Sequence, residues 1–152
     1  MRQFLSSGYV KLSLICCSLC FLFSCEKDDP VHSEVPAIEF LSATPDSVTE
    51  NQSITFSIKY TDGDGDLGAD QPNVYNLFLT DTRVNVTYQY RIKQLAPDNS
   101  TITITGTLNI LLNSTAIIGE DQSQDVIYSM YVVDRAGHQS NVITCPAIHV
   151  HK

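Results

Sequence analysis

From residue 36 onward, apolar and polar side chains alternate along the chain with the two-residue period of a β-strand. The clearest stretch is 54–60, in which every second residue is apolar: Ile54, Phe56, Ile58 and Tyr60. The same alternation covers 84–92 and 102–112, and less regular apolar runs cover 37–41, 74–79, 126–133 and 142–150. This pattern predicts seven or eight strands, several of them with one buried face.

No stretch has the 3.6-residue spacing of a helix, and the best candidate, 114–118, is only about one turn long. The chain is therefore predicted to be all-β. An immunoglobulin-like two-sheet sandwich over residues 36–152 fits this number of short strands, with a small barrel as the alternative. We expect Gly106 to mark a bend or bulge, and Pro146 to interrupt the last strand or place it at an edge.

The N-terminal residues have a different pattern. Leu12 to Phe23 form one apolar run, preceded by Arg2 and Lys11 and followed by a strongly polar segment. A membrane-spanning helix needs about 20 apolar residues, whereas the apolar part of a signal peptide needs about 7 to 15. Residues 1–24 are therefore predicted to be a signal peptide.

The sequence Leu22-Phe23-Ser24-Cys25 resembles the bacterial lipobox, in which a small residue precedes a cysteine that is lipidated and becomes the new N-terminus. The resemblance implies that Cys25 is a lipid-attachment site and that several acyl chains anchor the protein to a membrane. Glu26-Lys27-Asp28-Asp29 is similar to the acidic export tag of surface lipoproteins in one Gram-negative group. It implies an outward-facing position on the outer membrane, and the alternative is a merely solvated tether. Residues 25–35 are interpreted as this tether.

The charge of the chain argues against one class of partner. It carries 9 Lys and Arg against 17 Asp and Glu, a formal net charge of −8, and its basic residues are scattered singly. Binding to nucleic acid requires a concentrated basic surface that neutralises phosphates. Nucleic acid is therefore not an expected partner.

One segment, residues 61–70, has a composition that points to a metal. It contains four aspartates and three glycines, and carboxylates at alternate positions of a curled backbone can converge on Ca²⁺. It is not an EF-hand, because Leu67 stands where that loop needs glycine and Asn73 where it needs glutamate. The segment resembles the irregular calcium loops of cadherin-like sandwich modules. The candidate ligands are Asp62, Asp64 and Asp66, with Asp70 and Asp134 as lesser candidates.

Asp134 enters this set through topology. In an immunoglobulin-like sandwich, the loop after the second strand and the loop between the last two strands lie at the same end. Residues 132–140 also resemble the D-x-A-G-N-x-S turn of bacterial extracellular immunoglobulin-like modules, with His138 in place of Asn and Gly137 supplying a positive φ. The alternative for the acidic segment is a solvated Asp-Gly turn.

Two further features are expected to be inert. His149-Val150-His151 places two imidazoles on one side of an extended chain, but two ligands at a fraying end make a weak metal site. Cys145 lies in an apolar strand without an identifiable His partner and is expected to pack as a small hydrophobe.

These features predict a non-catalytic surface lipoprotein that acts as a binding or accessory module, with an unknown protein or glycan partner and with Ca²⁺ as a possible cofactor. The first alternative is a structural or assembly subunit of an envelope or transporter complex in the outer membrane. The second is a hydrolase that uses the acidic segment to hold a catalytic metal.

Overall fold

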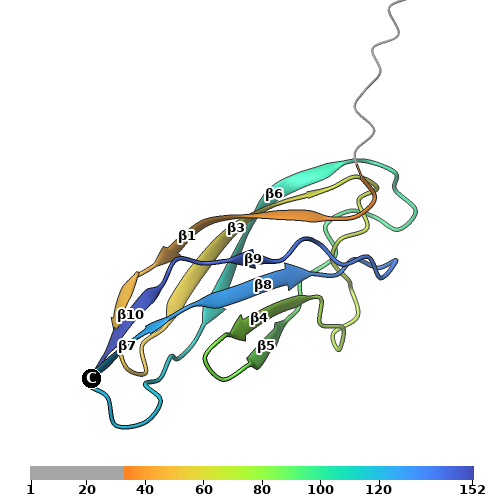
Figure 1. Ribbon diagram of the computed structural model, residues 1–152. Helices are drawn as coiled ribbons and strands as arrows, with labels where there is room; N and C mark the ends of the chain where they lie inside the picture. The colour runs from red at the N-terminus through yellow and green to blue at the C-terminus, as the bar shows by residue number, and fades with distance from the viewer. Residues whose placement is uncertain (1–32) are drawn as a thin grey trace, which may run out of the picture. The chain divides into compact units, whose positions relative to one another are not determined.

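The computed structural model describes residues 33–152, so the predicted signal peptide, Cys25 and most of the predicted tether lie outside the described residues. The described chain forms ten strands and no helix (Figure 1): β1 Ala37–Thr44, β2 Ser47–Thr49, β3 Ile54–Asp62, β4 Leu77–Asp81, β5 Val86–Tyr90, β6 Ile104–Leu112, β7 Ser123–Val126, β8 Tyr128–Val132, β9 Ile143–Thr144 and β10 Ile148–His151. Residues 33–152 accordingly contain no apolar helix of membrane-spanning length. The prediction of an all-β, sandwich-like fold is confirmed.

The strands form three hydrogen-bonded sheets. Their orders are β1-β3-β6, β2-β10-β7 and β5-β4-β8-β9. The second and third sheets share two continuous stretches of chain, because β7 runs into β8 and β9 is followed closely by β10. These two sheets follow one another end to end and form the layer of the sandwich opposite the β1-β3-β6 sheet (Figure 1). The chain crosses from the first sheet to the second between β1 and β2, at the cis Thr44–Pro45 bond.

The hydrophobic core lies between these layers, and β3 shows why the sequence folds this way. Its apolar residues at every second position are buried, and the polar residues between them are more exposed. Phe56 packs edge-on against Tyr128 of β8, with ring centroids 5.2 Å apart. The alternation predicted for 54–60 is therefore confirmed, and it directs one face of β3 toward the opposite layer.

The strand count exceeds the predicted seven or eight for local reasons. The predicted run 126–133 is divided at Ile127, and the run 142–150 is divided around Pro146, where a missing N–H ends the ladder. The three residues of β2 add a strand that carries too little pattern to be predicted from the sequence. Pro146 therefore interrupts the last strand, as expected.

Two details of the predicted pattern were wrong. The alternation over 84–92 predicted a buried face, yet Val86 and Tyr88 are exposed, because β5 is an edge strand of its sheet. Gly106 makes no bulge: it pairs regularly with Tyr60. A Cβ atom at Gly106 would lie 2.7 Å from Tyr60 Oη, so glycine there leaves room for the neighbouring aromatic ring.

Candidate metal centre

The acidic segment begins at the end of β3 with a buried carboxylate. Asp62 is the last residue of this strand and is 0 % exposed. Its Oδ2 accepts a hydrogen bond from the backbone N–H of Leu67 at 2.8 Å, which closes a compact loop. Leu67 is itself fully buried and fixes the loop to the core. One oxygen of Asp62 is therefore held by the loop, while the other remains available.

Glycines allow this loop to fold tightly against the rest of the domain. Gly65 and Gly68 both have positive φ, 77° and 88°, in the region that favours glycine. A Cβ atom at Gly68 would lie 2.2 Å from the carbonyl oxygen of Lys93, and one at Gly65 would lie 2.6 Å from that of Ile102. The two glycines therefore combine an unusual backbone conformation with close backbone contact.

The second half of the site is the turn that follows β8. Asp134 is buried at the start of this turn, and its Oδ1 accepts the backbone N–H of His138 at 2.7 Å. Its Oδ2 lies 3.1 Å from Nδ1 of the same histidine. Gly137 has a φ of 93°, which confirms the positive φ predicted for it. The turn thus fixes the carboxylate of Asp134 in one orientation.

Direct hydrogen bonds hold the loop and the turn together, although they are far apart in the sequence. The backbone N–H of Ala136 donates to Asp66 Oδ2 at 2.9 Å, and that of Arg135 donates to the carbonyl oxygen of Asp66 at 3.3 Å. The Arg135 guanidinium also donates to the carbonyl oxygen of Gly68 at 2.9 Å. The prediction that the two loops lie at the same end of the sandwich is confirmed.

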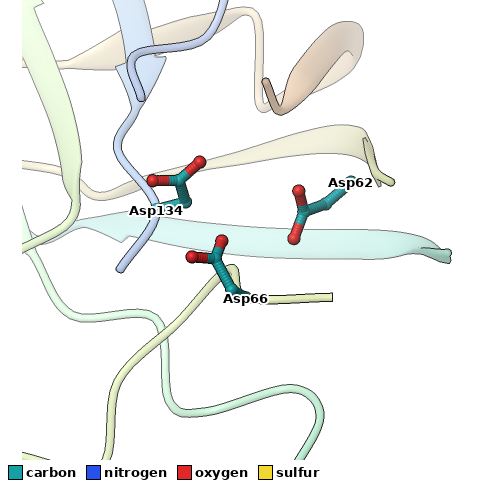
Figure 2. A group of neighbouring side chains, drawn as sticks. All are labelled: Asp62, Asp66 and Asp134. Atoms are coloured by element: carbon teal, nitrogen blue, oxygen red, sulfur yellow. The ribbon is translucent and has the colours of Figure 1, made fainter. Parts of the chain in front are cut away.

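These contacts bring three carboxylates together. Asp62, Asp66 and Asp134 each offer an oxygen within 4.8 Å of the others, and Figure 2 shows the three groups facing a common space. Oxygen ligands on opposite sides of a Ca²⁺ ion are about 5 Å apart, given Ca–O distances of 2.3–2.6 Å. The spread of the three oxygens therefore matches the size of a calcium coordination shell.

Several oxygens of this cluster lack the partners that buried polar atoms normally have. Oδ1 of Asp62, Asp64 and Asp66 is inaccessible to solvent in each case and forms no hydrogen bond within the described part of the protein. Buried polar atoms without a partner are rare in folded proteins and destabilise them. A cation bound by Asp62, Asp66 and Asp134 would give the unpartnered oxygens of Asp62 and Asp66 a partner.

The pKa values of two aspartates in the cluster also indicate negative charge that lacks a partner. The pKa of Asp62 is raised to about 6, chiefly by burial and also by the charges of Asp64, Asp66 and Asp134, against the opposing effect of the Leu67 N–H. The pKa of Asp66 is also raised, chiefly by burial and then by Asp134 and Asp64, against the opposing effects of the Ala136 N–H and of Arg135. The cluster thus holds more negative charge than its surroundings compensate.

The structure does not bring all five predicted ligands together. It gathers Asp62, Asp66 and Asp134. Asp64 lies close enough for its charge to affect Asp62 and Asp66, but it is outside the group of three converging carboxylates. Asp70 is exposed and takes no part in that group.

Sequence reasoning did not foresee the roles of two turn residues. The N–H of Ala136 binds Asp66, and His138 binds Asp134 through both its backbone and its ring. The i,i+4 spacing of Asp134 and His138 within the turn motif is the signal from which the second contact was predictable.

Other reactive groups lie elsewhere. Cys145 is buried in the core, and burial raises the pKa of its thiol to about 12, so the thiolate nucleophile is not formed near neutral pH.

A groove of about 450 Å³ opens between β6 and residues 90–95, with the cations of Arg91 and Lys93 among its lining. None of the acidic cluster lines this groove.

No known protein-family model and no curated protein sequence matches the chain.

Proposed function

We propose that this protein is a non-catalytic binding or accessory module, stabilised by Ca²⁺ and anchored to the outer membrane by lipid at Cys25. The observation that carries the calcium part is the convergence of Asp62, Asp66 and Asp134, with buried oxygens that lack partners. Carboxylate oxygens are hard ligands, which suit Ca²⁺ better than a softer transition metal.

The position of the cluster supports a structural ion more than a catalytic one. A catalytic metal keeps an open coordination position that faces a substrate cleft. Here Asp62 is fully buried, and the oxygens without partners are inaccessible to solvent. An ion between the loop after β3 and the turn after β8 stiffens one end of the sandwich, which is where such modules present their loops.

The anchoring part rests on the lipobox at Leu22–Cys25 and on the acidic residues that follow it. The core is complete within the compact unit Val31–Lys152. We therefore expect the domain to fold without the predicted signal peptide, and we interpret the residues that follow Cys25 as a tether.

Calcium binding is tested with a matched pair of variants in residues 26–152. Asp66→Asn removes a carboxylate of the cluster, and Asp70→Asn makes the same change four positions away on an exposed residue. We expect calorimetric titration to show one Ca²⁺ per protein. Its affinity should fall at least about tenfold in Asp66→Asn and remain unchanged in Asp70→Asn. Absence of binding, or equal affinity in the two variants, would refute the calcium site.

Anchoring is tested in cells of a Gram-negative host that exports lipoproteins. The full chain should incorporate labelled palmitate and should be removed from intact cells by an added protease. Cys25→Ala should lose the label and should no longer fractionate with the outer membrane. An unlabelled full chain would contradict the lipid anchor, and a labelled but protease-resistant one would place the domain on the inner face.

A further inference from the structure

The motif His149-Val150-His151 is held in the fold by strand pairing on both sides, which its place near the end of the sequence does not suggest. It occupies β10, the middle strand of the β2-β10-β7 sheet, where His149 pairs with Ser47 on one side and Asp125 on the other. Ile148 and Val150 are buried in the core. Because side chains alternate along a strand, His149 and His151 share the outward face. Both neighbouring strands therefore hold the pair in place, and the expectation of a fraying end was wrong.

The two imidazoles are close and similarly oriented. Their ring centroids are 6.0 Å apart, with an angle of 25° between the ring planes. The side chain of His149 is 52 % exposed, so solvent and solutes reach it. His151 Nε2 lies 3.4 Å from Thr49 Oγ1, a long contact that is easily given up. A metal bound by both rings would require side-chain rotations that direct one nitrogen of each ring to a shared point.

A carboxylate on the neighbouring strand prepares one ring for metal binding. Asp125 Oδ1 lies 2.9 Å from His149 Nδ1. This contact favours the tautomer in which Nδ1–H donates to the carboxylate, which leaves the lone pair of Nε2 free. Histidine ligands of metals almost always have such a second partner, because it fixes the ring and makes the ligand nitrogen more basic.

We propose that His149 and His151 form a binding site for a divalent transition metal ion, Cu²⁺ or Zn²⁺, with Asp125 orienting His149. Imidazole nitrogens suit these ions, and the usual order of affinities places Cu²⁺ first. Two protein ligands leave coordination positions open for water or for a side chain of a bound partner. The site lies at the opposite end of the sandwich from the acidic cluster (Figure 1) and does not depend on the proposed calcium function.

The test uses residues 26–152 without an affinity tag, in a buffer that does not coordinate metals and contains 1 mM Ca²⁺ to occupy the acidic cluster. We expect calorimetric titration at pH 7.5 to give one tight Cu²⁺ per protein and weaker Zn²⁺ binding. His149→Gln and His151→Gln should each lower the affinity at least about tenfold, and Asp125→Asn about tenfold. The control variant Asp70→Asn, which matches Asp125→Asn at an exposed position of the chain, should bind as the unaltered protein does.

A spectroscopic titration of the unaltered protein keeps the proposal testable if a variant fails to fold. Substoichiometric Zn²⁺ should shift the imidazole NMR signals of His149 and His151 and leave that of His138 in place. Three outcomes would overturn the proposal: no saturable binding below about 100 μM metal, unchanged affinity in the double variant, or loss of binding in Asp62→Asn, which would assign the ion to the acidic cluster.

Discussion

The clearest test of the acidic cluster is Asp62→Asn, because this change is expected to stabilise the calcium-free domain and to remove the stabilisation by calcium. The pKa of Asp62 is raised from 3.8 to about 6, so its ionised form is disfavoured in the folded domain by about 3 kcal/mol at neutral pH. Asparagine is neutral, and its side-chain oxygen still accepts the Leu67 N–H. In EDTA the variant should therefore be more stable than the unaltered protein, with a melting temperature about 10 °C higher.

Calcium should stabilise the unaltered protein much more than the variant, which brings the two to similar stability. A site with a Kd of about 10 μM adds about 2.7 kcal/mol at 1 mM Ca²⁺, which again corresponds to about 10 °C. Asp62→Asn lacks the buried carboxylate and should gain little. Thermal unfolding of residues 26–152, followed by circular dichroism in EDTA and in 1 mM Ca²⁺, measures all four values. The reasoning is refuted if the variant melts below the unaltered protein in EDTA, or if calcium stabilises both proteins equally.

Three further predictions concern pH, the loop glycines and the free thiol. The pKa of Asp62 is higher in the folded than in the unfolded protein, so between these two values the folded state binds more protons. The stability in EDTA should therefore fall as pH rises from about 4 to about 6 and then level off. A rise in melting temperature over this pH range would contradict the prediction. Gly68→Ala places a Cβ against the Lys93 carbonyl and should lower the free energy of unfolding by more than about 3 kcal/mol. Gly137→Ala places a Cβ with nothing within 4 Å and should lower it by about 1 kcal/mol. Urea unfolding of both variants measures the difference. Cys145 should react with iodoacetamide only in the denatured protein, and rapid labelling of the native domain would show that its thiol is accessible.

The fold was predictable where one strand face is buried and the other is not. The alternation along β3 identified its core residues, because its apolar side chains face the opposite layer. The same alternation misled in β5, whose residues Val86 and Tyr88 are exposed at the edge of their sheet. Periodicity describes the two faces of a strand but does not reveal whether anything covers them.

The sequence predicted the composition and the position of the site, but not which of the aspartates converge there. The density of aspartate and glycine identified the loop, and the topology of the sandwich brought in Asp134. What the sequence does not contain is the path of the backbone after Gly68. There the N–H of Ala69 donates to the carbonyl oxygen of Ile92, and Ala69 is buried. The next side chain, Asp70, consequently lies on the exposed side and misses the cluster.

The contact between Asp66 and Ala136 joins residues 70 positions apart in the chain. Closing such a long loop has a large entropic cost, so this contact favours late formation, after the strands that carry it have paired. A ligand accelerates folding only to the extent that its site already exists in the transition state; otherwise it slows unfolding. If an ion binds at this junction, it should therefore act mainly on the lifetime of the folded domain, and its removal should shorten that lifetime while leaving the rate of folding almost unchanged.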